Sequence, residues 1–369
     1  MPELFEPVTI GKWTLPNRVV MAPMTRTRAQ SGGVPSEHAA TYYRQRATAG
    51  LIITEGVQPS AVGQGYGNTP GLHTPAQVDG WRQVADAVHE AGGRIVAQLM
   101  HAGRIAHPDN KNGLETVAPS AVTAEGTMGT ATGRQPYPTP RALTTDELPL
   151  VVDEFRQAAQ AAVDAGLDGV ELHGANGYLL HQFLAPATNQ RTDGYGGSPA
   201  ARARFVAEAV VAAAQQIGPE RVGLRISPAN GANGLIEDDP AETAATYRAL
   251  VDAIAPLGLA FLHLSIDPAD PLLADLSARF GGPVVVNTGF ATVTDLETAQ
   301  SLVRGGKAAA VAVGRPFIAN PDLVRRWQES APLNEVDQAT VYGGGAHGYT
   351  DYPTLDGGSV SAADVRQDG

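Results

Sequence analysis

The chain has 369 residues and a formal net charge of −12 at pH 7; 43 % of the residues are apolar and none is cysteine. This apolar content supports a large core and excludes a disordered chain, while the missing cysteines exclude disulfides, iron–sulfur clusters and cysteine-ligated zinc. The acidic balance argues against a nucleic-acid partner. The first residues lack the pattern of a secretory signal and no run of 18 apolar residues occurs, so we expect a cytoplasmic protein without a membrane partner.

Short apolar runs recur along the chain, each bounded by glycine, proline or charge, which is typical of buried strands. These runs cover residues 18–25, 51–57, 94–101, 169–174, 222–227, 261–266, 283–289 and 309–315. Amphipathic stretches between the runs predict helices. The clearest of these stretches cover residues 75–91, 145–165, 199–217, 240–256 and 292–303.

Eight strands that alternate with helices, without a break in composition, predict an α/β fold of the (β/α)8 TIM-barrel type. The alternative is a doubly wound open sheet, but residues 22–25 (APMT) stand where that fold usually carries its Gly-rich fingerprint. We expect residues 1–353 to form a single domain. It begins with a short hairpin in residues 1–17 and has a long excursion after the third strand, residues 104–143, in the position of a lid. Residues 354–369 are predicted to be a flexible tail.

Chemistry in a TIM barrel gathers at the C-terminal ends of the strands, and polar residues cluster there in this sequence. Arg225 stands between Leu224 and Ile226, so its side chain points into the barrel mouth if these two pack on the helices. A charge in that position needs an anionic ligand or a partner, and Glu171 is the alternative partner. The other residues noted at strand ends are Thr25, Glu55, Gly56, Gln98, Met100, His101, His173, Asn176, Tyr178, Asn287, Thr288, Gly289, Gly314 and Arg315.

The ends of the seventh and eighth strands form the usual phosphate site of this fold. Gly289 and Gly314 would let backbone N–H groups approach phosphate oxygens, and Arg315 adds a cation. The sequence therefore predicts a phosphorylated cofactor or substrate, with ordinary glycine turns as the alternative.

Four ordered segments resemble the Old Yellow Enzyme family of flavin oxidoreductases, over a span from about Leu4 to Pro353. They are LPNRVVMAPMTRTRA, HGANGYLLHQFLAPATNQRTDGYGGS, AVGRPFIANPDLVRR and YGGGAHGYTDYP. Thr25, where another subgroup carries cysteine, is similar to the classical subgroup. The resemblance implies a non-covalent FMN at the barrel mouth, NADPH or NADH as hydride donor, and a monomer or small homo-oligomer. It also implies reduction of the activated C=C bonds of enones, maleimides, nitroalkenes and similar compounds.

The resemblance also implies roles for particular residues. His173 and Asn176 would bind a substrate oxygen, and Tyr178 would give a proton to the α carbon. Met100 stands where classical members commonly carry tryptophan, which favours a roomier pocket. FMN contacts would come from Pro23, Met24, Thr25, Gly56, Gln98, Arg225, Thr288, Gly289, Gly314 and Arg315. Substrate contacts would come from Tyr66, Met100, His173, Asn176 and Tyr342.

Several plainer interpretations remain open. Tyr66 and Tyr342 could be loop anchors, Glu55 and His101 could support the site, and His181 could pack on the following helix. We expect no metal site, because no second histidine stands at a spacing that would close one. A flavin-free lyase or isomerase would need a base in the mouth, yet none of the three lysines, Lys12, Lys111 and Lys307, ends a strand. A non-catalytic FMN carrier would not need His173, Asn176 and Tyr178 gathered over the flavin.

Overall fold

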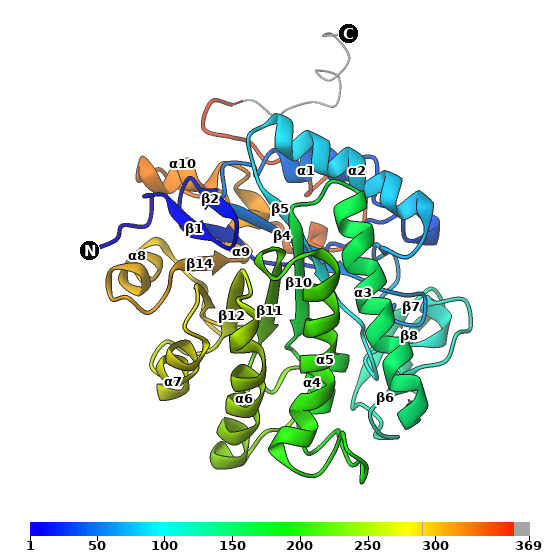
Figure 1. Ribbon diagram of the computed structural model, residues 1–369. Coiled ribbons are helices and arrows are strands. Elements are labelled where there is room, and N and C mark those ends of the chain that lie inside the picture. Colours follow the sequence, from blue (N-terminus) through cyan, green and yellow to red (C-terminus); the bar gives the residue numbers. More distant parts are fainter. Residues whose placement is uncertain (290, 358–369) are drawn as a thin grey trace.

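In the computed structural model, which describes residues 1–289 and 291–357, eight parallel strands close into a barrel (Figure 1). The strands follow chain order around the barrel, and the last one pairs with the first. This confirms the predicted (β/α)8 TIM barrel. The strands are β3 (Val19–Met21), β4 (Leu51–Val57), β5 (Ile95–Leu99), β10 (Gly169–Gly174), β11 (Val222–Ile226), β12 (Phe261–Ser265), β13 (Val284–Asn287) and β14 (Ala310–Val313).

The longer helices lie around the outside of the barrel (Figure 1). They are α2 (Pro75–Glu90), α3 (Leu148–Asp164), α5 (Pro199–Ile217), α6 (Pro240–Ile254), α7 (Pro271–Phe280) and α8 (Leu296–Arg304). The shorter helices are α1 (Ala39–Arg44), α4 (Leu179–Leu184), α9 (Arg315–Ala319) and α10 (Leu323–Gln328).

Helix starts follow local capping chemistry. Thr74 and Gln77 form a capping box at the start of α2, and Ser198 caps α5, which begins with proline. The helix expected from residue 292 begins only at Leu296, because the carboxylate of Asp295 accepts the N–H of Thr298 and so sets the start of α8.

Apolar side chains close the N-terminal end of the barrel. The predicted hairpin is present as β1 (Val8–Ile10) and β2 (Trp13–Leu15), and its buried residues pack with inward-facing residues of the strands, including Phe261. Gly223 makes room for this ring, since a Cβ there would lie 2.3 Å from the ring of Phe261. Because side chains fill the N-terminal end of the barrel, a ligand site is expected at the C-terminal end.

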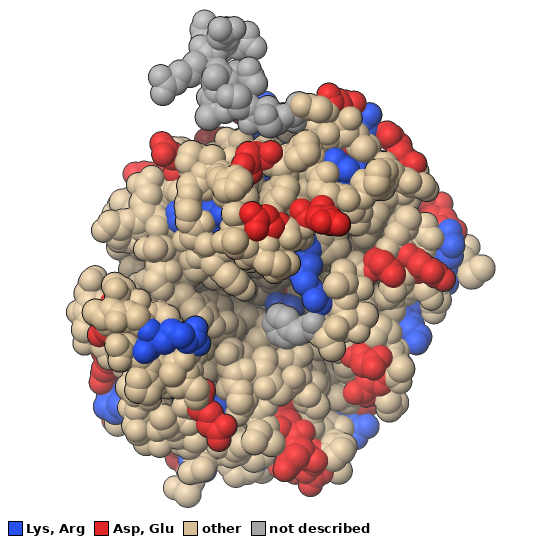
Figure 2. Space-filling view, turned by 180° about the vertical axis from the view of Figure 1, so that it is seen from behind, with Lys and Arg blue, Asp and Glu red and all other residues tan. Residues whose placement is uncertain are grey.

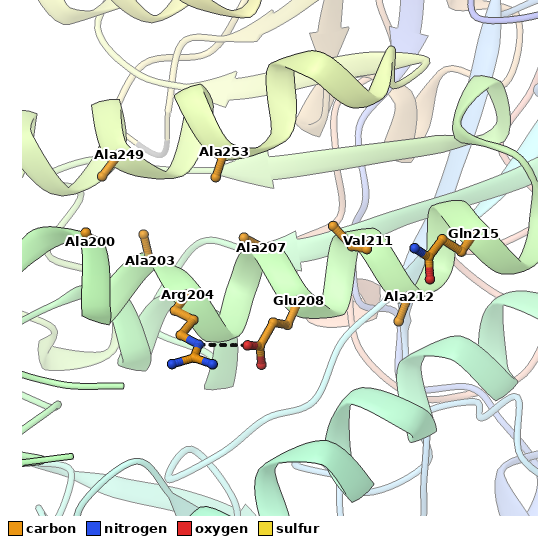
Figure 3. A pocket seen from close by; sticks show the side chains of 10 residues that line it. All are labelled: Ala200, Ala203, Arg204, Ala207, Glu208, Val211, Ala212, Gln215, Ala249 and Ala253. Atoms are coloured by element: carbon orange, nitrogen blue, oxygen red, sulfur yellow. Dashed lines mark hydrogen bonds and ion pairs between the residues drawn. The ribbon is translucent and has the colours of Figure 1, made fainter. Parts of the chain in front are cut away.

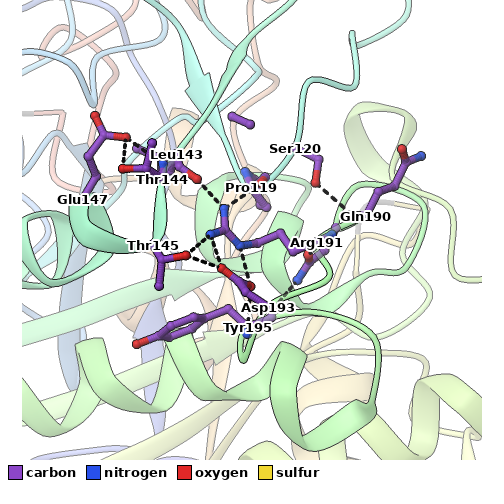
Figure 4. A network of polar contacts seen from close by, with 12 residues as sticks. Pro119, Ser120, Leu143, Thr144, Thr145, Glu147, Gln190, Arg191, Asp193 and Tyr195 are labelled. Carbon is purple, nitrogen blue, oxygen red and sulfur yellow. Dashed lines mark hydrogen bonds and ion pairs between the residues drawn. The ribbon is translucent and has the colours of Figure 1, made fainter.

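The excursion after β5 forms two small sheets beside the barrel. A hairpin consists of β7 (Thr127–Thr130) and β8 (Gly133–Pro136), and the short strands β6 (Val117–Ala118) and β9 (Arg141–Ala142) pair in parallel. Arg191, in the segment after α4, ties this excursion down (Figure 4). Its guanidinium donates to the carbonyl oxygens of Pro119, at 3.1 Å, and of Leu143, and binds the carboxylate of Asp193. The excursion is therefore fastened to the segment that follows β10.

No helix in the described ranges is both long and apolar enough to cross a membrane. Of the predicted tail, residues 354–357 are described and residues 358–369 lie outside the described residues.

Candidate active site

The C-terminal ends of the barrel strands form one rim, because all eight strands run parallel. The face shown in Figure 2 is hollowed near its centre, and Lys or Arg side chains are visible inside the hollow. Gly56, Gln98, His173 and Arg225 lie on the strands themselves. The residues that follow strand ends are Pro23, Met24, Thr25, Met100, Asn176, Tyr178, Thr288, Gly289, Gly314 and Arg315.

Four strands end two or more residues earlier than predicted, at Met21, Leu99, Asn287 and Val313. Pro23 has no N–H to donate to a neighbouring strand, and Gly289 has a φ of 86°, which no extended strand allows. The residues beyond these ends therefore lie on loops at the rim rather than on the strands.

The segment after β10 makes a fixed turn. Asn176 and Gly177 have φ values of 58° and 80°, and Gly177 is needed because a Cβ would lie 2.6 Å from the carbonyl oxygen of Ala232. The backbone N–H of Asn176 donates to the hydroxyl of Ser227 at 2.9 Å, and its carbonyl accepts from the Asn233 amide at 2.8 Å. These contacts fix the course of the turn that carries Asn176 and Tyr178, shortly after His173 on β10.

His173 and Tyr178 lie together at this turn, with ring centroids 5.1 Å apart. Burial lowers the pKa of His173 well below its usual value, and the Arg225 cation adds to the effect, so the imidazole is neutral at pH 7. Burial raises the pKa of Tyr178, so its hydroxyl keeps its proton. Nδ1 of His173 and Oδ1 of Asn176 are buried without a hydrogen-bond partner among the described residues. The turn therefore carries two buried polar atoms that are available to a ligand and one protonated hydroxyl that could act as an acid.

Tyr178 is hydrogen-bonded to Tyr66, with the hydroxyl oxygens 2.8 Å apart and the rings edge to face. Both rings pack, together with Tyr137 of the excursion, on a small apolar cluster that includes Met128. Tyr342 is 67 % exposed, yet it lies close enough to add slightly to the raised pKa of Tyr178. Sequence reasoning missed Tyr137, because nothing in its neighbourhood indicates that this part of the excursion folds back to the rim.

A buried polar network crosses the barrel interior below the rim. One carboxylate oxygen of Glu171 accepts from Nε2 of Gln98 at 2.8 Å, and the other lies 2.7 Å from Nδ1 of His263. All three side chains are buried. Sequence reasoning also missed His263, although it stands between Leu262 and Leu264 and the alternation that singled out Arg225 applies to it equally.

Arg225 lies in register with His173 on one neighbouring strand and with His263 on the other. Its side chain is buried, and its Nε has no hydrogen-bond partner among the described residues. Within the same ranges the carboxylate of Glu171 pairs with His263 and not with Arg225, so the alternative of a direct ion pair is wrong. Burial lowers the pKa of Arg225, and the nearby Glu171 counteracts this. A buried guanidinium of this kind favours a polar or anionic ligand.

The ends of β13 and β14 lie side by side, as the phosphate prediction requires. Nη2 of Arg315 donates to the carbonyl oxygen of Thr292 at 3.0 Å, which links the loops after these two strands. The N–H of Gly289 donates to Oδ1 of Asn287 at 3.1 Å, and the hydroxyl of Thr288 lies 2.8 Å from that of Thr294. Binding of a phosphate at this corner remains a prediction.

Gly56 and Met100 are matched to each other. A Cβ at position 56 would lie 2.7 Å from the sulfur of Met100, whose side chain is buried. Any side chain larger than glycine would therefore displace the methionine.

Glu55, His101 and His181 make structural hydrogen bonds. The Glu55 carboxylate accepts the N–H of Arg26 at 3.1 Å, and burial raises the pKa of Glu55 to about 7. Nδ1 of His101 accepts the N–H of Gly103 at 3.1 Å. His181 lies 2.8 Å from the hydroxyl of Tyr247 on α6. In the described part of the chain no group of three or more His, Asp or Glu side chains could hold a metal ion.

A groove of about 490 Å³ lies on the outer surface between α5 and α6 (Figure 3). It is lined mainly by alanines, together with the ion pair of Arg204 and Glu208. No buried polar group without a partner belongs to its lining among the described residues. It lacks the chemistry of the rim and is not the candidate active site.

The rim fits a flat polar ring that carries a phosphate, which FMN provides in one molecule. Nε of Arg225, Nδ1 of His173 and Oδ1 of Asn176 are the unpartnered buried atoms there. The hydroxyl of Thr25 also makes no hydrogen bond within residues 1–289 and 291–357. Burying such groups is costly unless a ligand supplies the missing partners.

Comparison with known proteins gives consistent results. A model of the NADH:flavin oxidoreductase / NADH oxidase family matches residues 3–334. A probable flavin mononucleotide-dependent alkene reductase of Leishmania infantum is 42 % identical over 362 residues, which cover 95 % of this chain and 97 % of that protein. The structure of morphinone reductase in complex with tetrahydroNAD is 46 % identical, with a TM-score of 0.91, over 96 % of this chain and 98 % of that chain.

An old yellow enzyme homologue from Zymomonas mobilis is 40 % identical, with a TM-score of 0.91, over 96 % of this chain and 100 % of that chain. The resemblance to the Old Yellow Enzyme family is thereby confirmed. The chain belongs to the NADH:flavin oxidoreductase / NADH oxidase family and is an FMN-dependent oxidoreductase that uses NAD(P)H.

Proposed function

We propose that this oxidoreductase is an ene-reductase, which reduces the C=C bond of electron-poor alkenes such as enones, maleimides and nitroalkenes. The observation that carries the proposal is the convergence of His173, Asn176 and Tyr178 on one fixed turn at the rim. The name of the relative from Leishmania infantum, an alkene reductase, supports it.

His173 and Asn176 bind the oxygen of the group that activates the alkene. The neutral imidazole has one N–H and the asparagine amide has two, so both can donate to the same carbonyl or nitro oxygen. This oxygen gains negative charge while the C=C bond is reduced. Loss of one such donor typically costs about 3–4 kcal/mol in the transition state.

FMN, when bound, would supply the hydride for the β carbon, and NADPH or NADH would be the source of that hydride. Pro23, Met24 and Thr25 would line one edge of its ring system, with Gly56 close by. Gln98 and Arg225 would contact the pyrimidine part. The phosphate would lie at the corner formed by Thr288, Gly289, Gly314 and Arg315. Tyr66, Met100 and Tyr342 would line the space for the alkene.

Tyr178 gives its proton to the α carbon of the alkene. Its raised pKa keeps the hydroxyl protonated at neutral pH, and Tyr66, 2.8 Å away, can donate a hydrogen bond to the phenolate that remains. A general acid of this kind contributes about 10²- to 10⁴-fold to the rate.

The test replaces Tyr178 by Phe and follows the two half-reactions separately by flavin absorbance under anaerobic conditions. Bleaching by NADPH should keep its rate, and the return of colour on cyclohexenone should slow by about 10²-fold or more. The Tyr195→Phe variant is the control, because the Tyr195 hydroxyl binds the carboxylate of Glu208 at 3.0 Å and takes no part in the contacts of Tyr178. It should behave as wild type in both steps. Equal slowing of both steps in Tyr178→Phe would contradict the assigned role.

A non-catalytic FMN carrier predicts a different result, namely bleaching by NADPH with no return of colour on any alkene. Membership of the flavin oxidoreductase family overturns the flavin-free lyase or isomerase interpretation. On the strength of the resemblance, we also propose four further properties of the protein. These are a cytoplasmic location, a monomer or small homo-oligomer, a preference for NADPH, and a single domain over residues 1–353.

A further inference from the structure

We propose that Glu171 and His263 form a positioning pair beneath the flavin, which fixes the amide of Gln98, places one negative charge beside Arg225 and so holds down the redox potential of bound FMN. The inference rests on the proposed placement of FMN against Gln98 and Arg225. Neither member of the pair has a part in the FMN contacts, the substrate contacts or the proton transfer described above.

The pair lies one layer below the rim. Glu171 is in register with Gln98, and His173, two residues further along the same face of β10, is in register with Arg225. Arg225 is in turn in register with His263. The carboxylate of Glu171 therefore links β5 to β12 through its contacts with Gln98 and His263, directly beneath residues proposed to contact the cofactor.

The contacts indicate the protonation of the pair. Nδ1 of His263 lies 2.7 Å from the carboxylate, while its Nε2 is buried without a partner among the described residues. An imidazolium would leave a charged N–H unsatisfied at Nε2, which is far more costly than an unused lone pair. Burial accordingly lowers the pKa of His263. A neutral His263 donates from Nδ1 to an ionised Glu171, and the pair carries one net negative charge.

Glu171 also orients Gln98. Nε2 of Gln98 donates to the carboxylate at 2.8 Å, and an ionised carboxylate only accepts hydrogen bonds. The amide therefore keeps its oxygen for the ligand, where it can accept an N–H such as the one at N3 of the flavin ring. A glutamine at position 171 could donate instead, which would let the Gln98 amide turn over.

The charge of the pair acts on Arg225. Glu171 raises the pKa of Arg225, so the two groups are close enough to interact electrostatically. Reduction of FMN adds negative charge at its pyrimidine edge, which Arg225 stabilises and Glu171 opposes. Both side chains are buried, so salt screens the interaction much less than it would at the surface. Removal of the carboxylate charge should therefore make FMN easier to reduce.

The first test compares the two-electron midpoint potential of FMN bound to the full-length wild-type enzyme and to Glu171→Gln, in a spectroelectrochemical titration without alkene. The equilibrium constant for reduction should rise at least tenfold in the variant, a positive shift of about 30 mV. Glu154→Gln is the matched control. This half-buried carboxyl on α3 binds the hydroxyl of Ser60 at 2.8 Å, outside the barrel, and its loss should leave the potential unchanged.

Two variants at the partner position provide an independent test. His263→Leu leaves the carboxylate without its Nδ1 donor, so the buried group should take up a proton and the potential should rise as in Glu171→Gln. His263→Asn restores a donor at a similar place and should return the potential close to wild type. A purely structural role would lower thermal stability in these variants without moving the potential.

The proposal would be overturned if Glu171→Gln or His263→Leu binds FMN and the midpoint potential of that FMN is the same as in the wild type. If Glu171→Gln does not retain FMN, the contrast between His263→Leu and His263→Asn decides. Because no alkene is present, an enzyme that shows the predicted shifts but reduces no alkene would contradict the proposed function and leave this inference standing.

Discussion

Two tyrosine hydroxyls meet at the rim, those of Tyr66 and Tyr178, 2.8 Å apart. Burial raises the pKa of Tyr178, while the hydrogen bond from Tyr66 lowers it, because the bond stabilises the phenolate. Tyr66→Phe removes that bond, so the pKa of Tyr178 should rise further and its proton should be harder to release. One hydrogen bond is worth about 1 kcal/mol, which corresponds to a roughly fivefold slower return of colour on cyclohexenone at pH 7.

The pH profile of this half-reaction distinguishes the effect from a general disturbance. The rate falls at high pH where Tyr178 loses its proton, so a higher pKa moves this alkaline limb to higher pH in Tyr66→Phe. Tyr195→Phe, which removes a hydroxyl that binds Glu208, should leave the limb in place. An alkaline limb that stays put, or moves to lower pH, in Tyr66→Phe would mean that Tyr66 does not act on the proton donor.

Single residues were predictable where their sequence spacing already determined their place. His173, Asn176 and Tyr178 are close in sequence, and the turn at Gly177 keeps them close in space. Tyr137 reaches the rim through the folded excursion, and contacts that depend on such long-range packing leave no local pattern. The alternation of side chains along the strand could have predicted that His263 points into the barrel. Its contact with Glu171 could not have been predicted in this way, because the two residues are 92 positions apart in sequence and meet only in the closed barrel.

Among the structural elements, the excursion depends on one side chain. Arg191 joins the carbonyl oxygens of Pro119 and Leu143 to the carboxylate of Asp193, and it holds the pKa of Asp193 well below its usual value (Figure 4). Arg191→Ala should leave these acceptors unsatisfied and lower the free energy of unfolding by about 2–3 kcal/mol. Thermal unfolding measures the loss, and limited proteolysis should show faster cleavage within residues 104–143.

The control for this prediction is Arg204→Ala. Arg204 pairs with Glu208 one turn further along α5, at an exposed site, so its loss should leave the free energy of unfolding almost unchanged. Equal stability and equal proteolysis of the two variants would show that Arg191 does not anchor the excursion.

Elements with a strong periodic pattern were predicted best. The helix over residues 199–217 coincides with α5, and all eight barrel strands were located. Helix α7 was not singled out in advance, because its ten residues give a short pattern between two buried strands. The predicted strands ran two or more residues too far at β3, β5, β13 and β14, because the run of strand-like residues continues into the loops after the backbone has left the sheet.

At the scale of the whole molecule, the barrel explains why residues far apart in sequence share one site. Parallel strands bring every C-terminal end to the same rim, while the hairpin β1–β2 and Phe261 close the other end. The architecture and the location of the site could therefore be predicted from the alternation of strands and helices. The protonation of the buried network could not, because it depends on distances that only the folded barrel defines.

The most direct test of the account is a crystal structure of the enzyme with FMN bound. We expect the ring system to lie across the rim, with its pyrimidine part against Gln98 and Arg225, its phosphate where β13 and β14 end, and the Tyr178 hydroxyl above its face. Well-ordered FMN in another place, such as the groove between α5 and α6, or a rim filled by the protein's own side chains, would contradict it.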